Sequence, residues 1–145
     1  MSHKPKMHSL DSLREGLVER FVFEPTEKMM QSFMEISGDM SPVHTDVNYA
    51  KSRGFDGVVV YGGILVAQIS RMVGMHLPGH DAFSRGLNIH YVRPLLVGQQ
   101  AELEARVAHI SEATSSIELK FKITSQGKTL AKGSAGVQIL KPDGQ

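Results

Sequence analysis

The 145-residue chain has no cysteine, which excludes disulfides, thiolate nucleophiles and zinc sites with thiolate ligands. An active site must therefore be built from histidine, carboxylate, hydroxyl and backbone groups. The sequence also lacks an apolar run of the about 18 residues that a membrane helix needs. Its first residues lack the apolar stretch of a secretory signal. We expect a cytoplasmic protein that does not enter a membrane.

The chain also lacks an excess of positive or negative charge. The 16 Lys and Arg and the 15 Asp and Glu are dispersed along the chain and leave a net charge of +1. No block of like charge attracts a phosphate backbone or an anionic lipid, so nucleic acid is excluded as an expected partner. A chain of this length fits one domain, which buries about 70% of the surface of the unfolded chain.

The first third of the chain predicts one strand and one helix. Residues 1–14 are polar and expected to be frayed, and residues 16–23 carry enough Val and Phe for a strand. Thr26 suits the N-cap of the following helix, and Gly38 suits its left-handed C-terminal cap. Asp39 thus begins a loop directly after a helix end.

A longer second helix is predicted over residues 61–76, before Pro78 ends it. Apolar residues cover most of its circumference, so we expect this helix to be enclosed. Gly62 and Gly63, near its start, would leave backbone N–H groups uncovered by side chains.

Apolar residues alternate with polar ones in the second half of the chain, which is typical of half-buried strands. The alternating positions are Leu87, Ile89 and Tyr91, then Leu103, Ala105 and Val107, then Ile117, Leu119, Phe121 and Ile123, and finally Thr129, Ala131, Ala135, Val137 and Ile139. The elements predict an α+β domain over residues 15–141, an antiparallel sheet curled around the long helix. Because one curled sheet leaves an edge and part of its outer face open, we expect a homodimer.

A carboxylate and an imidazole lie five residues apart, at Asp39 and His44, with Pro42 between them. Pro42 disfavours helix at Ser41, so the loop can fold back and bring both side chains to one small site. Such a pair can hold and activate a water molecule, as general acid–base catalysis requires. The structural alternatives are a turn-forming Asp39 and a hydrogen-bonded core His44.

The glycine pair at the head of the long helix could serve the same site. Bare N–H groups of Gly62 and Gly63 at the positive end of a helix dipole suit a developing oxyanion. The structural alternative is close packing of the helix against the sheet. An acid–base pair, an oxyanion donor and an apolar helix together indicate an acyl-binding active site.

The loop also follows a longer motif: Asp, two residues, Pro, one residue, His, one residue, Asp, then an aromatic residue and Ala. Its positions are filled by Asp39, Pro42, His44, Asp46, Tyr49 and Ala50. With this motif the chain resembles the MaoC-like dehydratases, which include the (R)-specific enoyl-CoA hydratases and adopt the hot dog fold. The similarity continues through Phe55 and residues 58–63, 77–79 and 92–98.

The resemblance implies a role for each matching residue. Asp39 and His44 would bind and activate the water, and the Gly62 N–H would donate to the thioester carbonyl. Ser70 falls at the position of a family serine near the acyl pocket, although a hydrogen bond to its own helix is an equal alternative. Tyr61 stands where the family usually has His, where its hydroxyl could reach either the substrate or a main-chain group.

The activity so implied is that of a hydro-lyase that interconverts a trans-2-enoyl thioester and an (R)-3-hydroxyacyl thioester. The acyl group would be carried by CoA or by an acyl-carrier protein, and no metal, flavin or nicotinamide would be required. The family resemblance also fits a homodimer or a trimer of dimers. A hot dog thioesterase and a non-catalytic subunit that binds acyl thioesters are the alternatives.

The remaining histidines do not predict a metal site. His76 and His80 are four residues apart, but Pro78 between them rules out the two-His geometry of a helical site. His90 and His109 fall with the polar residues of predicted strands, where solvent exposure is expected. Asp46 is expected to cap a short helix over residues 47–51.

Overall fold

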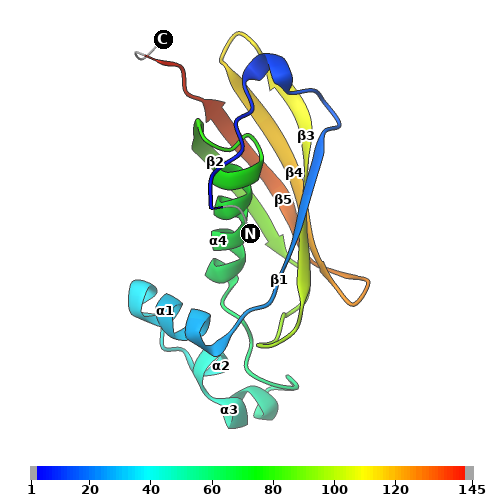
Figure 1. Ribbon diagram of the computed structural model, residues 1–145. Helices are drawn as coiled ribbons and strands as arrows, with labels where there is room; N and C mark the ends of the chain where they lie inside the picture. Colours follow the sequence, from blue (N-terminus) through cyan, green and yellow to red (C-terminus); the bar gives the residue numbers. More distant parts are fainter. Residues whose placement is uncertain (1–2, 143–145) are drawn as a thin grey trace.

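A computed structural model describes residues 3–142 as a five-stranded antiparallel sheet curled around one helix, α4 (Figure 1). The strands are β1 (Val18–Phe23), β2 (Ala82–Tyr91), β3 (Ala101–Ser111), β4 (Ser116–Ser125) and β5 (Lys128–Ile139), in the spatial order β1-β3-β4-β5-β2. The helical segments are η1 (Leu10–Ser12), α1 (Glu27–Ser37), α2 (Pro42–Thr45), α3 (Val47–Ser52), α4 (Gly62–Arg71) and the π-helical η2 (Met72–His76). This confirms the predicted α+β architecture, and the sheet is not closed into a barrel.

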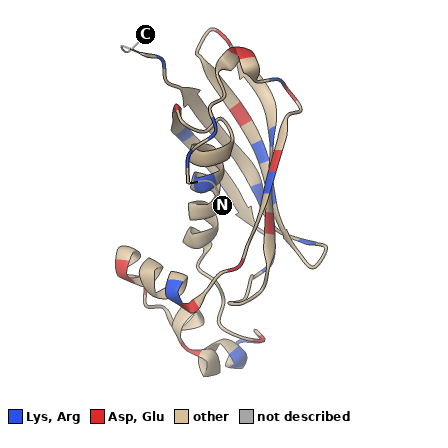
Figure 2. Cartoon of the chain, in the orientation of Figure 1, with Lys and Arg blue, Asp and Glu red and all other residues tan. Residues whose placement is uncertain are grey.

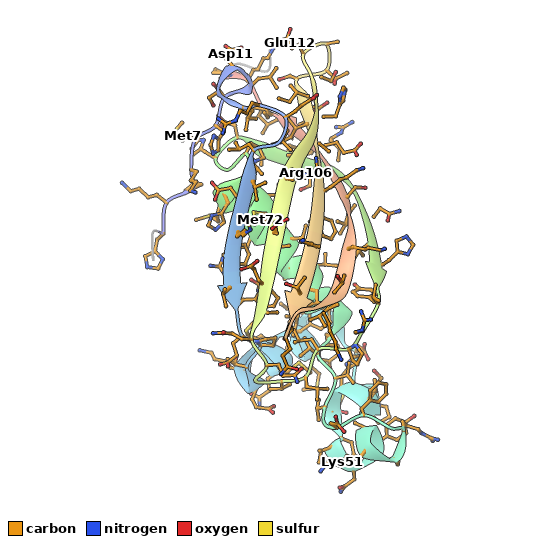
Figure 3. All side chains as sticks on the ribbon, turned by 90° about the vertical axis from the view of Figure 1, so that its right-hand side faces the viewer. Met7, Asp11, Lys51, Met72, Arg106 and Glu112 are labelled. Carbon is orange, nitrogen blue, oxygen red and sulfur yellow. The ribbon has the colours of Figure 1, made fainter. Side chains whose placement is uncertain are left out.

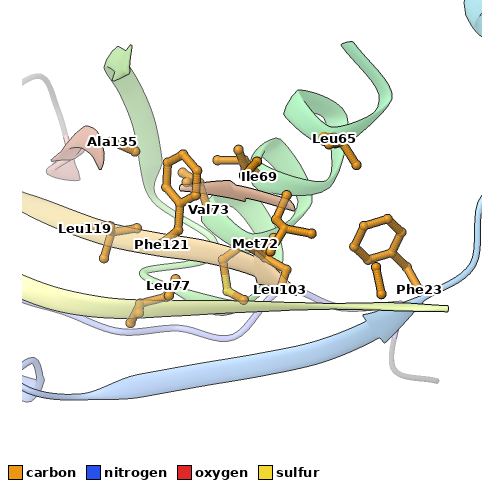
Figure 4. Close-up of a cluster of buried hydrophobic side chains, with 14 of the residues drawn as sticks. Phe23, Leu65, Ile69, Met72, Val73, Leu77, Leu103, Leu119, Phe121 and Ala135 are labelled. Atoms are coloured by element: carbon orange, nitrogen blue, oxygen red, sulfur yellow. The ribbon is translucent and has the colours of Figure 1, made fainter. Parts of the chain in front are cut away.

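The alternation of the late strands separates the two faces of the sheet. In the register of β3 and β4, Leu103 pairs with Ile123 and Val107 with Leu119, and all four are buried. These side chains face α4 and η2 and form a continuous core with Phe23, Leu65, Ile69 and Met72 (Figure 4).

The outer face of the sheet is polar. Opposite charges pair across β3 and β4, where Glu104 lies opposite Lys122 and their side chains approach to 3.8 Å. Lys and Arg alternate with Asp and Glu over this face, whereas α4 is largely uncharged (Figure 2). Figure 3 looks onto this face, with Arg106 on β3, and shows Lys51 of α3 at the opposite end of the molecule from Asp11 and Glu112. No helix within residues 3–142 is long and apolar enough to cross a membrane.

The long helix is less enclosed than its composition predicts. Ile64, Leu65 and Ile69 are buried, but Ala67 and Ser70 are exposed. The reason is that the core contacts only one side of α4, and the opposite side has no covering element within the described chain.

The local end signals of α1 are confirmed. The Thr26 side chain accepts a hydrogen bond from the Met29 N–H at 3.2 Å, and Gly38 ends the helix in the left-handed conformation with φ of 72°. The turn between β4 and β5 has positive φ at both central residues, 52° at Gln126 and 73° at Gly127. That is the geometry of a type I′ hairpin turn.

The amino-terminal segment differs from the expectation of a frayed end. The Lys6 N–H donates to the Met75 carbonyl at 2.9 Å, the His80 N–H donates to the Lys6 carbonyl at 2.8 Å, and Met7 forms a β-bridge with Gly79. Gly79 has φ of 96°, and the Lys6 carbonyl occupies the place where a Cβ would stand. Main-chain pairing of this kind leaves no trace in the composition of the segment. Residues 1 and 2 lie outside the described residues.

Candidate functional site

Of the predicted acid–base pair, Asp39 lies on the turn between α1 and α2, and His44 lies in α2. Gly38 ends α1, and Asp39 is the first residue after this cap. The Asp39 carboxylate accepts a hydrogen bond from the Ser41 N–H at 2.9 Å, which closes the turn. Ser41 is extended, with φ of −60° and ψ of 139°, and Pro42 begins α2. The structure therefore has the backbone reversal that Pro42 predicts.

The carboxylate of Asp39 is exposed in the single chain and favours its ionised form. Hydrogen bonds from the side chain and backbone of Ser41 hold the pKa of Asp39 below its ordinary value, and His44 nearby lowers it further. A slight desolvation acts in the opposite direction. The group is therefore a carboxylate at neutral pH.

The imidazole of His44 has a fixed orientation. Its Nδ1 lies 2.6 Å from the carbonyl oxygen of Val59. A carbonyl can only accept, so Nδ1 carries a proton and Nε2 is left for a ligand. The Val59 N–H donates to the Val43 carbonyl at 3.1 Å, and the Val60 N–H donates to the Leu95 carbonyl at 2.8 Å. This segment thus joins α2, which carries His44, to the segment that follows β2.

Tyr61 connects the two members of the pair. Its hydroxyl donates to the main-chain carbonyl of Asp39 at 2.6 Å, and its ring stacks on His44 with centroids 4.3 Å apart. The Phe33 ring lies on it as well, at 4.7 Å. Tyr61 is 2% exposed, and burial together with the charge of Asp39 raises the pKa of its hydroxyl. Its hydroxyl therefore contacts main chain, one of the two alternatives left open by the sequence.

The start of α4 has no side-chain cap, because Tyr61 at the N-cap position makes no capping hydrogen bond. Gly62 and Gly63 are the first two residues of the helix. A Cβ on Gly62 would lie 2.7 Å from Cζ of Tyr91, and a Cβ on Gly63 would overlap the Phe33 ring. Close packing therefore requires glycine at position 63, whereas a Cβ at position 62 would meet only the end of the half-exposed Tyr91 side chain.

Tyr91 is a component of this region that the sequence did not indicate. It is the last residue of β2 and 54% exposed, and its ring lies against Gly62 at the helix start. Burial of part of the side chain raises the pKa of its hydroxyl. The alternating pattern places Tyr91 on a strand, but no local signal predicts which helix residue it meets.

Two hollows adjoin His44. The first, of about 380 Å³, is bordered by His44, Gly62, Leu65, Tyr91 and Leu95. The second, of about 300 Å³, lies beside His44 and Tyr61 and is lined by methionines of α1. The imidazole, the uncapped helix start and an apolar wall thus face one space large enough for a small acyl group.

Ser70 lies apart from this group. It is eight residues beyond Gly62, which corresponds to about 12 Å along a helix axis. It is exposed and borders a different hollow, of about 410 Å³, between α4 and β2, together with Val66, Val73 and Leu87. The single chain therefore brings Asp39, His44, Tyr61, Gly62 and Gly63 together, but not Ser70.

The other polar residues singled out in the sequence have structural positions. Asp46 accepts from the N–H groups of Asn48 and Tyr49 and caps α3, as predicted. His90 and His109 are exposed on strands, also as predicted. In the described part of the chain, no three His, Asp or Glu side chains are grouped so that they could hold a metal ion.

Comparison with known proteins gives a consistent set of relatives. The family described as "MaoC like domain" matches residues 14–129. The chain is 29% identical over 109 residues to the (R)-specific enoyl-CoA hydratase of Aeromonas caviae, covering 74% of this chain and 81% of the relative. It is 24% identical over 133 residues to the 3-hydroxybutyryl-CoA dehydratase of Methylorubrum extorquens, covering 92% and 85%. The solved structure of an A. caviae (R)-hydratase superposes with a TM-score of 0.85 at 26% identity, covering 88% of this chain and 98% of that structure.

Proposed function

Because this chain belongs to the MaoC-like domain family, we propose that it reversibly adds water to a trans-2-enoyl thioester to give a 3-hydroxyacyl thioester. The observation that carries the proposal is the orientation of His44. Its Nδ1 donates to Val59, which leaves Nε2 available, and His44 lines a hollow that also borders the uncapped start of α4. The ionised Asp39 stands on the turn just before α2, the helix that carries His44. Relatives named as hydratases and dehydratases support the same reaction.

In the hydration direction, the oxygen of water bonds to C3 of the enoyl group while one of its protons passes to Asp39. The electrons of the double bond move toward the thioester carbonyl, and the Gly62 N–H stabilises the enolate oxygen. The proton that Asp39 received then passes to Nε2 of His44, which delivers it to C2 as the carbonyl reforms. Asp39 and His44 thereby return to their starting protonation states for the next turnover.

The low pKa of Asp39 in the single chain suits binding of the water more than removal of its proton. A bound acyl chain would cover the exposed carboxylate, and burial disfavours the charged form. The pKa of Asp39 would then rise toward the range in which a carboxylate is an effective base. On this account, substrate binding itself activates the base.

This chemistry needs only side chains and backbone, and we propose that it proceeds in the cytoplasm without a metal, flavin or nicotinamide cofactor. Preparing the protein in EDTA tests the metal part of the proposal, because the activity should survive chelation. The acyl group would be carried on CoA or on an acyl-carrier protein.

The direct test is to mix the purified protein with crotonyl-CoA and to follow the loss of the enoyl absorbance. Formation of 3-hydroxybutyryl-CoA, absent in the Asp39→Asn variant, is the expected result. Release of free CoA without hydration would identify a thioesterase. Binding of crotonyl-CoA without any turnover would identify a non-catalytic subunit, and either result would overturn the proposed reaction.

We also propose that the protein is a homodimer, or a trimer of dimers, that covers β2. Among residues 3–142 this edge strand pairs only with β5, and its Phe83, Leu87 and Tyr91 side chains are 48%, 44% and 54% exposed. Large apolar groups on an open edge are unfavourable in water, and a second copy would cover them. Sedimentation at micromolar concentration should give a dimer or a multiple of it, which Leu87→Lys weakens, whereas a monomeric native chain would contradict the proposal.

A further inference from the structure

The hydroxyl of Tyr91 lies at the start of α4 and is available to a ligand. Its oxygen is 2.8 Å from the position that a Cβ on Gly62 would occupy. Tyr91 and Gly62 both border the hollow of about 380 Å³ beside His44. Among residues 3–142, no group forms a hydrogen bond with this hydroxyl. A polar group without a protein partner thus stands next to the helix start, on the wall of the candidate site.

The backbone N–H of Gly62 is available at the same place. Gly62 is the first residue of α4, and Tyr61 before it provides no side-chain cap, so this N–H has no partner within the helix. The Cα–Cβ bond of a helical residue is tilted toward the N-terminal end of its helix, the end toward which the first N–H groups also point. The Tyr91 hydroxyl therefore lies on the side of Gly62 to which the free N–H is directed.

One oxygen atom can accept hydrogen bonds from both donors. Because the Tyr91 hydroxyl oxygen is 2.8 Å from the Cβ position of Gly62, it is at most about 5.3 Å from the Gly62 nitrogen. Two hydrogen bonds of about 2.9 Å each can span that separation. A carbonyl oxygen placed between Tyr91 and Gly62 would thus receive one hydrogen bond from each.

The surroundings of Tyr91 favour donation. Burial of part of the side chain raises the pKa of its hydroxyl, so the hydroxyl keeps its proton at neutral pH. The hollow that it borders has apolar walls at Val60, Leu65 and Leu95 and no bordering carboxylate. A hydrogen bond in such surroundings is stronger than one in water. A second copy over β2, as proposed for the dimer, would exclude water from the ring further.

We propose that Tyr91 is a catalytic residue, whose hydroxyl donates a second hydrogen bond, beside that of the Gly62 N–H, to the carbonyl oxygen of the bound thioester. The inference rests on the proposed function, in which the Gly62 N–H stabilises this oxygen. As water adds to C3, negative charge collects on the oxygen, and both donors bind it more strongly than they bind the neutral carbonyl. The Tyr91 proton stays on its own oxygen throughout, so the hydroxyl adds no proton transfer to the reaction.

Tyr91→Phe tests the inference, because it removes the hydroxyl and keeps the ring against Gly62. In steady-state kinetics with crotonyl-CoA, we expect kcat to fall at least about tenfold and KM to change less than about threefold, since the donor acts mainly on the charged oxygen. The melting temperature should stay the same, because the lost hydroxyl has no partner among residues 3–142. Tyr49→Phe, on α3 and outside both hollows beside His44, is the matched control and should keep native turnover.

A second measurement does not depend on turnover. Butyryl-CoA carries the same thioester without the double bond, so it can bind but not react. Difference infrared spectroscopy reports the stretching frequency of its carbonyl in the bound state. A hydrogen bond to the oxygen weakens the C=O bond, so this frequency should be lower in the native protein and in Tyr49→Phe than in Tyr91→Phe.

The two measurements separate the inference from the proposed reaction. Native turnover of Tyr91→Phe, or a carbonyl frequency that the substitution leaves unchanged, would overturn the inference, and so would failure of the native protein to bind butyryl-CoA. A lower melting temperature of Tyr91→Phe together with a native carbonyl frequency would also overturn it, by identifying a structural role. A carbonyl frequency that depends on Tyr91, without hydration of crotonyl-CoA by the native protein, would overturn only the reaction.

Discussion

The hydroxyl of Tyr61 donates to the main-chain carbonyl of Asp39 at 2.6 Å, so the residue at the helix start holds the loop that carries the carboxylate. The same ring lies against His44. Tyr61 therefore positions both members of the acid–base pair without its hydroxyl facing a ligand.

Tyr61→Phe removes the hydroxyl and keeps the buried ring. We expect the free energy of unfolding to fall by about 1 kcal/mol, the usual net value of one such hydrogen bond. Turnover should change by less than about threefold, since the stacking on His44 remains. Chemical denaturation and steady-state kinetics measure the two effects. Unchanged stability with a tenfold loss of turnover would show that the hydroxyl acts on the substrate.

Asp39→Asn and His44→Ala should each lower the turnover of crotonyl-CoA at least about a hundredfold. Asp39 is exposed, so its replacement by Asn should leave the melting temperature nearly unchanged. His44→Ala also removes the bond to Val59 and the stacking on Tyr61, and a moderate loss of stability is expected with it. His109→Ala, at an exposed position of β3, is the control. Near-normal turnover in both site variants would remove Asp39 and His44 from the mechanism.

Much of the fold could be predicted because its signals are local. Thr26, Gly38 and Asp46 act within a few residues of their positions, and the alternation along β3 and β4 directly determines which side chains are buried. The turn at Pro42 is local as well, since a proline restricts the residue before it. These features could therefore be predicted from the sequence without knowledge of the tertiary structure.

The contacts that could not be predicted join segments far apart in the chain. Tyr91 meets Gly62, and Phe33 meets Gly63, only because the sheet and α1 fold onto the start of α4. The pairing of Lys6 with Met75 is equally remote in sequence and uses main-chain atoms, which any residue supplies. Enclosure of α4 was overestimated for a related reason: helical periodicity reports how apolar a face is, but not whether an element covers it.

Replacing Gly62 or Gly63 by alanine, which adds a methyl group at the start of α4, should affect the stability of the protein differently. Gly63→Ala places a Cβ within the Phe33 ring, and such overpacking costs about 1–3 kcal/mol of stability. The Cβ of Gly62→Ala would meet the Tyr91 ring, which is half-exposed and can move aside. The free energy of unfolding of this variant should therefore change by less than about 1 kcal/mol. Its rate of hydration of crotonyl-CoA should fall.

Repacking variants separate these effects. Phe33→Leu should restore part of the stability lost in Gly63→Ala, because a smaller side chain leaves room for the Cβ. Tyr91→Ala should not restore the activity of Gly62→Ala if the added methyl interferes with the thioester. Equal losses of stability in the two glycine variants would contradict the view that only Gly63 is tightly enclosed.

The free energy of unfolding should depend on the protonation of His76, which lies at the end of the molecule opposite α3. Its ring stacks on Phe21 with centroids 5.2 Å apart. Burial lowers the pKa of His76 below 6.5, the charge of Lys6 lowers it further, Glu19 raises it, and Arg71 lowers it. Because the folded state binds this proton less readily than the unfolded state, protonation favours unfolding. The stability that the neutral His76 ring contributes is present above pH 6.5. It is lost as the pH falls through that value toward the lower pKa of His76 in the folded state.

The free energy of unfolding should therefore decrease from pH 7.5 to pH 5, and His76→Gln should flatten that decrease because Gln does not titrate. His90→Gln, at an exposed position of β2, should leave the pH dependence unchanged. Urea denaturation at several pH values gives the free energies, and an NMR titration gives the pKa of His76 directly. A pKa of His76 above 6.5, or a His76→Gln profile parallel to that of the native protein, would show that this ring does not couple folding to pH.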